Sequence, residues 1–318
     1  MKHGNIRNLN RPVPRVVLGT MIVSSDEQDR SEALLDAAFE TGLRALDTAH
    51  VYAGGKSEQG IGAWLHKRGC RDDVTILSKG CHPDEAGPRV TPEALETDLA
   101  ISLERLQVDT IDIYMLHRDD PDQPVGPLVE AFNTCLREGK IRAFGASNWT
   151  HARIQAANEY AEQNGLVPFA ASSPNYGLAE QLENPWGPGC VTISGPQNEA
   201  ARVWYRKRDM PVFAYSSLGR GLFSGRMTRE NHEQLADNAC RKAYCHEVNF
   251  ERLDRARELA AKKRCSVPQL ALAFVLNQDL NVFALTGAAS REECEANAAA
   301  ADIELTPAEL AWLDRGAV

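Results

Sequence analysis

The sequence lacks several features that would assign it to a membrane or to a nucleic-acid surface. No apolar run in its 318 residues approaches the ~20 residues that a membrane-spanning helix needs. The segment from Met1 to Asn5 has no apolar region of the kind found in secretory signals. Basic residues are outnumbered, with 35 Lys and Arg against 44 Asp and Glu and a net charge of −9, which disfavours nucleic acid and anionic lipid as partners. We therefore expect a cytoplasmic protein that binds neither.

The common cysteine and glycine motifs are also missing. The eight cysteines include no C-x-x-C pair, so in a chain of this length they are expected to be reduced and mostly structural. Cys240, Cys245 and His246 are close in sequence, but their spacing fits no common zinc pattern, and we predict no metal site. No G-x-G-x-x-G follows the first apolar run, which argues against a doubly wound dinucleotide-binding sheet. The run 55–57 (Gly-Lys-Ser) looks like the end of a phosphate loop, but His50 stands where that motif requires glycine.

The sequence does contain eight short apolar runs that alternate with segments of helical periodicity. The runs predict strands at Val16–Leu18, Leu43–Leu46, Val74–Leu77, Ile111–Leu116, Ile141–Gly145, Val167–Ala171, Pro211–Tyr215 and Val282–Leu285. A long polar loop is expected after the seventh strand, up to about residue 248, and two closing helices over 290–300 and 306–313. Eight strand-helix units predict an α/β fold, a (β/α)8 TIM barrel, as a single domain over 1–318 with extended active-site loops and extra C-terminal helices.

Polar side chains follow several of the predicted strands. Asp47 comes at the end of the second strand, and Tyr52 lies five residues later, before a Gly-Gly turn. Lys79 follows the third strand and His117 the fourth. Each has an ordinary explanation on its own, such as a snorkelling lysine or a histidine that belongs to the core. Because the loops after the strands build the active site of such a barrel, their occurrence at successive strand ends predicts one shared site.

These four residue types suit proton transfer to a carbonyl oxygen. Tyrosine alone is too weak an acid near neutral pH, since its ordinary pKa is about 10. A lysine ammonium beside the phenol is expected to lower that pKa, while Asp47 keeps Lys79 charged and oriented. His117 can donate to, or orient, a carbonyl oxygen. The set predicts a proton donor for an oxygen that gains negative charge when hydride reaches its carbon.

At these positions the sequence resembles the aldo-keto reductase superfamily, and the resemblance runs through nearly the whole chain. It matches Asp47, Tyr52, Lys79 and His117 to the family's catalytic tetrad and implies an NAD(P)(H)-dependent oxidoreductase that interconverts a carbonyl and an alcohol. A non-catalytic nucleotide-binding regulatory subunit is the alternative, which the presence of all four tetrad residues disfavours. A metal-dependent barrel enzyme is a second alternative, but the strand ends offer no ligand cluster with suitable spacing.

The same resemblance implies where a nicotinamide cofactor binds. Ser147 and Asn148 match the carboxamide contact, Tyr215 matches the ring that stacks on the nicotinamide, and 214–221 resembles the pyrophosphate loop. The stretch 285–297 resembles the adenosine-phosphate segment. The cofactor contacts implied in this way are Thr20, Ser147, Asn148, Ser173, Tyr215, Ser216, Ser217, Leu218, Gly219, Gly221, Thr286, Gly287, Ser290, Arg291, Glu293 and Asn297.

Departures from the family pattern bear on the choice of cofactor. Ser173 stands where the family usually has Gln, and its shorter side chain can still bond the carboxamide. Gly287 and Glu293 replace basic residues that often hold the 2′-phosphate. Arg291 can substitute for them, because it lies in the first turn of a predicted helix whose N-terminus attracts phosphate. The sequence therefore favours NADP(H), with NAD(H) as the alternative because Glu293 can accept a hydrogen bond from a free 2′-hydroxyl.

The loops beside the predicted tetrad carry charged and aromatic side chains. The loop after the fourth strand supplies a guanidinium and two carboxylates, and an imidazole follows the third strand. Trp186 lies in a Pro/Gly-rich segment, 184–196, where an indole can cover the apolar face of a sugar ring. These features predict a polar, polyhydroxylated carbonyl substrate such as a sugar; the alternative is that the charges are solvated and the indole anchors its own loop. The predicted substrate contacts are His82, Arg118, Asp119, Asp120, Trp149 and Trp186.

Overall fold

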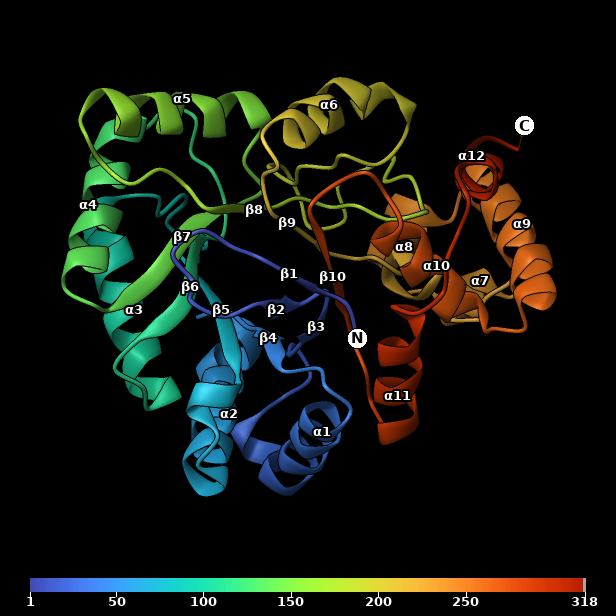
Figure 1. Cartoon of the computed structure of the whole chain (residues 1–318), viewed down its shortest axis with the longest axis horizontal. Coiled ribbons are helices and arrows are strands. Elements are labelled where there is room, and N and C mark those ends of the chain that lie inside the picture. The colour runs from blue at the N-terminus through green and yellow to red at the C-terminus, as the bar shows by residue number, and fades with distance from the viewer. Residues whose placement is uncertain (317–318) are drawn as a thin grey trace.

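Eight parallel strands close into a barrel in the computed structural model, which describes residues 1–316 (Figure 1). The strands are β3 (Val16–Gly19), β4 (Ala45–Asp47), β5 (Thr75–Gly80), β6 (Ile111–Leu116), β7 (Ile141–Ser147), β8 (Ala171–Ser173), β9 (Val212–Ala214) and β10 (Val282–Thr286). They pair in the order β10-β3-β4-β5-β6-β7-β8-β9. The predicted (β/α)8 barrel is confirmed. The predicted domain also includes residues 317 and 318, which lie outside the described residues.

Helices surround the barrel and connect its strands from the outside (Figure 1). They are α1 (Gln28–Glu40), α2 (Lys56–Arg68), α3 (Pro92–Leu106), α4 (Val125–Arg137), α5 (His151–Gln163), α6 (Glu199–Lys207), α7 (His232–Leu235), α8 (Asn238–Tyr244), α9 (Glu247–Lys263), α10 (Val267–Leu276), α11 (Arg291–Ala300) and α12 (Pro307–Arg315). Ser266 and Thr306 begin α10 and α12 with capping boxes, which satisfy backbone N–H groups of the first turn. None of the helices between residues 1 and 316 is both long and apolar enough to cross a membrane.

Strand side chains alternate between the barrel interior and the surrounding helices, as the pleat requires. Leu77, Ile113 and Phe213 belong to an inner apolar cluster, whereas a larger cluster joins the outward side chains to the helices. Gly145 on β7 allows a close approach of β8, because a Cβ there would lie 2.0 Å from the Ala171 carbonyl oxygen. The interior is therefore a packed core, and the ends of the barrel remain for function.

A short antiparallel hairpin of β1 (His3–Gly4) and β2 (Val13–Pro14) precedes the barrel. Ile6 and Val13 pack into the inner apolar cluster, so the hairpin closes the end at which the strands begin. The sequence does not predict this hairpin, because two-residue strands are too short to show a periodic pattern.

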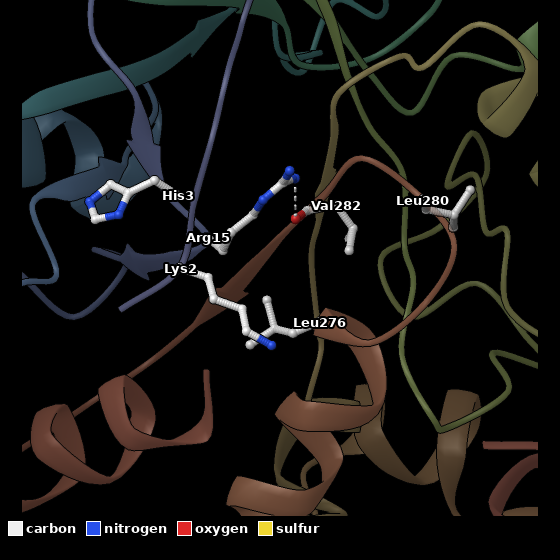
Figure 2. A pocket seen from close by; sticks show the side chains of 6 residues that line it. All are labelled: Lys2, His3, Arg15, Leu276, Leu280 and Val282. Carbon is white, nitrogen blue, oxygen red and sulfur yellow. Dashed lines mark hydrogen bonds between the residues drawn. The ribbon is translucent and has the colours of Figure 1, made fainter. Parts of the chain in front are cut away.

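A cleft of about 370 Å³, lined by basic and aliphatic side chains, lies beside this hairpin (Figure 2). Arg15 crosses it and donates to the Val282 carbonyl oxygen at 3.0 Å and to Asn281 Oδ1 at 2.6 Å. Because Arg15 precedes β3 and Val282 begins β10, the cleft lies at the end of the barrel opposite to the predicted tetrad.

Two predicted elements were wrong in place or kind. The sixth strand was predicted at 167–171 but is β8, 171–173. Both main-chain groups of Val167 bond the Asn133 side chain, at 2.9 and 3.0 Å, instead of a strand ladder. The loop predicted up to residue 248 contains α7 and α8, and Asp237 caps α8 by accepting from Cys240 N at 2.7 Å.

Candidate active site

The loop after β4 bends sharply before α2 begins. Tyr52 opens a short turn in which Ala53, Gly54 and Gly55 have left-handed φ angles of 50°, 63° and 93°. A side chain at Gly55 would be strained by its φ of 93°, and its Cβ would also displace the Arg105 guanidinium. The Gly-Gly turn expected from the sequence therefore exists, and it returns the Tyr52 phenol to the strand ends.

Lys79 contacts both Tyr52, the predicted acid, and Asp47. From the end of β5, its Nζ lies 2.5 Å from Asp47 Oδ1, 2.9 Å from the Thr48 carbonyl oxygen and 3.4 Å from Tyr52 Oη. Asp47 and Lys79 are both buried. The ring of His117 lies beside the phenol, with 5.8 Å between the ring centroids of Tyr52 and His117. The fold thus brings together the four residues predicted for the tetrad.

The charges in this cluster follow from burial and pairing. Burial is the largest single effect on the pKa of Lys79 and lowers it, but Asp47 and Tyr52 together outweigh burial, so the pKa stays above its ordinary value and the amine is charged. Burial raises the pKa of Tyr52, and the opposing effect of Lys79 does not overcome it. The expectation of a lowered phenol pKa is therefore wrong in net direction. Tyr52 is protonated at neutral pH, as a proton donor must be.

His117 is a neutral imidazole at the same site. Burial is the main cause that holds its pKa well below the ordinary value, and the charges of Lys79 and Arg118 act in the same direction. Its backbone N–H donates to the Gly80 carbonyl oxygen at 2.8 Å. Among residues 1–316, no group bonds the buried Nδ1 of its ring. The ring is therefore held in place with hydrogen-bonding capacity to spare for another molecule.

An ion pair between Arg105 and Glu58, which the sequence did not predict, lies next to the four predicted tetrad residues. Arg105 on α3 donates to the His50 carbonyl oxygen at 2.9 Å and lies 3.4 Å from Glu58 Oε2. Glu58 is fully buried on α2, and its other oxygen accepts from Ser78 Oγ at 2.7 Å. Ser78 is the neighbour of Lys79. The pair thus ties the Tyr52 loop to the strand that carries the lysine; in sequence, Glu58 is only an acid in a first helical turn.

Asn148 links the ends of the next strands. It has a left-handed φ of 60°. Its Nδ2 donates to the His117 carbonyl oxygen at 3.2 Å, and its Oδ1 accepts from Tyr215 Oη at 2.7 Å and from Val191 N at 3.1 Å. Ser147 Oγ donates to the Ser173 carbonyl oxygen at 2.9 Å. The side chains of Ser147, Asn148 and Tyr215 predicted for the nicotinamide therefore lie together. The Ser173 hydroxyl, predicted for the same group, instead donates to the Phe213 carbonyl oxygen at 2.9 Å.

The segment after β9 is a tight turn that contains several left-handed residues. Ser216, Gly219, Arg220 and Gly221 have left-handed φ angles of 55°, 56°, 49° and 95°. The N–H groups of Gly219 and Gly221 donate within the turn, to the carbonyl oxygens of Ser216 at 2.8 Å and Leu218 at 3.2 Å. Ser217 Oγ bonds the Ala214 carbonyl oxygen at 3.0 Å, so this hydroxyl braces the turn. The sequence resemblance assigns this segment, with Leu218 inside it, to the diphosphate of a dinucleotide, and this assignment stays a prediction.

The adenosine segment is bonded mainly to itself. The Gly287 carbonyl oxygen accepts from Asn297 Nδ2 at 3.0 Å and from Thr286 Oγ1 at 3.3 Å. Ser290 caps α11, and Glu293 Oε2 accepts from Ala289 N at 2.8 Å. These bonds shape the loop between β10 and α11.

Arg291 and Thr20 are engaged elsewhere. The Arg291 guanidinium, predicted for a 2′-phosphate, lies 2.7 Å from Glu40 Oε2 on α1. Thr20 is fully buried, and its Oγ1 donates to the Asp47 carbonyl oxygen at 2.9 Å. Because Thr20 is fully buried and its hydroxyl braces the loop after β4, it does not offer the cofactor contact that was predicted.

Three predicted substrate contacts also need correction. Trp149 is fully buried, and its Nε1 donates to the Arg118 carbonyl oxygen at 3.1 Å, so it belongs to the core. Asp119 Oδ1 accepts from Arg153 Nε at 3.2 Å. Asp120 Oδ1 accepts from the backbone of its own turn. The two carboxylates shape their loop, whereas the alternative explanation had them solvated.

Of the other three, His82 and Arg118 lie beside His117, and Trp186 lies beside Tyr215. The His82 ring centroid lies 4.9 Å from that of His117, and Arg118 Nη1 donates to the His117 carbonyl oxygen at 3.0 Å. Arg118 forms no ion pair within residues 1–316. Trp186 is 40% exposed, and its ring centroid lies 5.8 Å from that of Tyr215.

Comparison with known proteins agrees with this arrangement. The Aldo/keto reductase family model matches residues 15–316. Aldo-keto reductase str7 of Strobilurus tenacellus is 30% identical over 295 residues, covering 91% of this chain and 81% of that protein. The NADH-specific methylglyoxal reductase of Escherichia coli (strain K12) is 29% identical over 310 residues, covering 89% and 86%. The crystal structure of an aldo-keto reductase from Klebsiella pneumoniae in complex with NADPH is 30% identical, with a TM-score of 0.72, covering 99% of this chain and 95% of that one. This chain therefore belongs to the aldo/keto reductase family.

Proposed function

We propose that this protein interconverts a carbonyl and an alcohol by hydride transfer with a nicotinamide cofactor, using Tyr52 as general acid and base. The observation that carries the proposal is the position of Lys79 Nζ, 2.5 Å from Asp47 Oδ1 and 3.4 Å from Tyr52 Oη. The bound cofactor supplies or accepts the hydride. In reduction, the phenol of Tyr52 gives its proton to the substrate oxygen, and the Lys79 ammonium stabilises the phenolate that remains. A ring nitrogen of the neutral His117 donates to the same oxygen and orients it.

The regulatory-subunit alternative is less favourable. A protein that only binds a nucleotide has no need for a buried, charged lysine bonded to both a carboxylate and a phenol, because burying charge is costly. We propose the cytoplasm as its compartment on composition alone.

Tyr52→Phe tests the mechanism. The variant keeps the ring but loses the proton, so turnover should fall by roughly 10²–10⁴-fold. The absorbance of the nicotinamide measures turnover with both cofactors over aldehydes, ketones and sugars, and fluorescence measures the cofactor's dissociation constant, which should not change. Retention of more than half the turnover would exclude Tyr52 as the acid. A wild-type protein that binds the cofactor but turns over no substrate in the panel would favour the regulatory alternative.

For the cofactor we propose a preference for NADP(H). Relatives support both choices, since the Klebsiella neighbour is in complex with NADPH and the E. coli relative is NADH-specific. Arg291 lies in the first turn of α11, where phosphate is favoured. Its ion pair with Glu40 joins two half-exposed side chains and is therefore weak enough to exchange for a phosphate. Tighter binding of NADH than of NADPH by tenfold, about 1.4 kcal/mol, would overturn this preference.

For the substrate we propose a polar, polyhydroxylated carbonyl compound such as a sugar derivative. Asp119 and Asp120 are engaged by Arg153 and by their own turn and do not support this proposal. The guanidinium of Arg118, which forms no ion pair within residues 1–316, and the exposed indole of Trp186 support it. Arg118→Gln should reduce kcat/KM for sugars more than for apolar ketones of similar size. Asp119→Asn is the matched control and should preserve the preference. Equal losses on both substrate classes, or a preference for apolar ketones, would contradict the proposal.

A further inference from the structure

Two thiols meet at the C-terminal end of α8. The helix closes with a hydrogen bond from Cys245 N to the Cys240 carbonyl oxygen at 3.2 Å, which folds the chain back on itself. The two sulfur atoms therefore lie 3.8 Å apart, although five residues separate them in sequence. Cys240 is fully buried and Cys245 is partly exposed. Within residues 1–316, no group of three or more His, Cys, Asp or Glu side chains is arranged to hold a metal, so a metal does not explain the pair.

The helix α8 also contacts the segment 214–221, which is predicted to bind the cofactor's diphosphate. Cys240 Sγ lies 3.6 Å from the Gly219 carbonyl oxygen. Asp237, which caps α8 through Cys240 N, also forms an ion pair with Arg220. A displacement of Cys240 is therefore expected to shift Gly219 and Arg220, two successive residues of the left-handed turn.

We propose that Cys240 and Cys245 form a thiol–disulfide modification site, and that closing the disulfide weakens dinucleotide binding. A disulfide requires about 2.05 Å between the sulfur atoms, so from 3.8 Å they need to approach by less than 2 Å. That approach takes place at a helix end with one partly exposed cysteine, where an oxidant has access. The second half of the proposal rests on the proposed function, because it assigns the segment 214–221 to the cofactor.

The chemistry divides naturally between the two residues. The contact with Cys240 lowers the pKa of Cys245, burial opposes this effect, and the charge of Arg241 adds to it. The Cys245 thiolate attacks hydrogen peroxide, which cleaves the O–O bond and leaves a sulfenic acid and hydroxide. The Cys240 sulfur then attacks the sulfenic sulfur, and water leaves with the Cys240 proton. In total, two thiols and one peroxide give one disulfide and two waters.

The consequence for binding follows from the lost thiol proton. A disulfide sulfur has no hydrogen to donate to the Gly219 carbonyl oxygen, and it is drawn away from that oxygen toward Cys245. The turn beside Arg220 loses a support on its buried side. We expect the dissociation constant of the dinucleotide to rise about fivefold, the order of one lost hydrogen bond.

Trypsin offers a direct test, because Arg241 and Lys242 stand between the two cysteines. The reduced protein gives separate peptides, 230–241 and 243–252, whereas the disulfide links them. The full-length protein is treated with hydrogen peroxide and digested under non-reducing conditions, and the dinucleotide's dissociation constant is measured by fluorescence before and after. We expect the linked pair of peptides, a fivefold weaker affinity, and recovery of both on adding dithiothreitol.

The matched controls are Cys245→Ser, which should show neither change, and Cys265→Ser, a partly exposed thiol elsewhere that should behave as wild type. Peroxide treatment that oxidises Cys245 to a sulfinic acid without a link would overturn the proposed site. A complete link with unchanged affinity would overturn the proposed effect. If the reduced protein bound neither NADPH nor NADH, the proposed function would fail, while the peptide test of the disulfide would still stand.

Discussion

The two sides of the active-site end are held together in different ways. On the proton-transfer side, β5 and β6 are six-residue strands whose backbone ladder continues to Gly80 and Leu116, next to His117. On the nucleotide side, β8 and β9 have three residues each and share the single register pair Ser172–Val212. There, side-chain bonds replace the ladder, and Asn148 alone joins three segments of the chain.

This difference matches what each side is proposed to do. Proton transfer needs reacting atoms held within a fraction of an ångström. The β5–β6 ladder holds Lys79 and leads to His117, and the contacts of Lys79 in turn hold Asp47 and Tyr52. A site that admits and releases a dinucleotide has to open, and irregular segments open at a lower free energy than strands in a core. We infer a rigid proton-transfer side and an adaptable nucleotide side. The predictions below run from the largest expected effect to the smallest.

Lys79→Met should break the proton-transfer side. Turnover should fall by about 10²-fold or more, since the proton route loses its charge partner. Reduction uses the protonated phenol, so its rate is constant at neutral pH and falls as the pH rises through the Tyr52 pKa; alcohol oxidation uses the phenolate and rises over the same range. Because Lys79 acts to lower that pKa, both transitions should move to higher pH in the variant.

The pH dependence of kcat/KM in both directions measures this shift. Lys79→Met combined with Asp47→Asn is the control for the buried carboxylate that the single change leaves unpaired. An alkaline transition that stays in place or moves to lower pH would contradict the assignment.

Asn148→Gly should weaken cofactor binding on the nucleotide side of the site. Glycine accepts the left-handed φ of 60°, so the change removes the amide without backbone strain. The bonds to Tyr215, Val191 and the His117 carbonyl oxygen are lost, and the cofactor's dissociation constant should rise about tenfold, or about 1.4 kcal/mol. Fluorescence titration measures the affinity. A large loss of kcat at saturating cofactor, with unchanged affinity, would place Asn148 on the wrong side of the comparison.

Arg105→Met tests whether the proton-transfer side depends on its support. The change removes the anchor of the His50 carbonyl oxygen and leaves the fully buried Glu58 without its guanidinium, which should cost about 3 kcal/mol of unfolding free energy. Adding Glu58→Gln should restore stability, measured by urea unfolding, but not kcat, which should remain about fivefold low because the Tyr52 loop is less well positioned. Full recovery of kcat in the double variant would show that Arg105 serves stability alone.

Glu40→Gln should sharpen the nucleotide side by a small amount. The change frees Arg291 from its ion pair without altering the size of the side chain. NADPH affinity should improve about two- to threefold relative to NADH, the order of an exposed ion pair. Arg291→Gln is the opposing control and should lower the NADPH preference. No change in the ratio of the two dissociation constants in either variant would mean that Arg291 does not meet the 2′-phosphate.

The sequence by itself determined the barrel and the order of the tetrad, because both depend on local signals. Eight apolar runs with helical segments between them specify the strands, and Asp47 and Lys79 stand directly at the ends of two of them. The turn after Tyr52 requires residues with left-handed φ angles, and the pair Gly54 and Gly55 predicts such a turn from the sequence. The sequence did not predict the hairpin of β1 and β2 or the position of the short strand β8, because two or three residues are too few to show a periodic pattern of apolar side chains.

Only the tertiary structure decided which polar groups are free and how they are charged. Asp119 is bonded to Arg153, 34 residues away, and Arg291 to Glu40, 251 residues away, so neither engagement is visible in a local pattern. The pKa of Tyr52 depends on how deeply the fold buries the phenol as well as on its lysine, and burial reverses the direction expected from the pair alone. Desolvation and ion pairing sum over neighbours that the fold assembles from distant parts of the chain, which is why they follow the fold and cannot precede it.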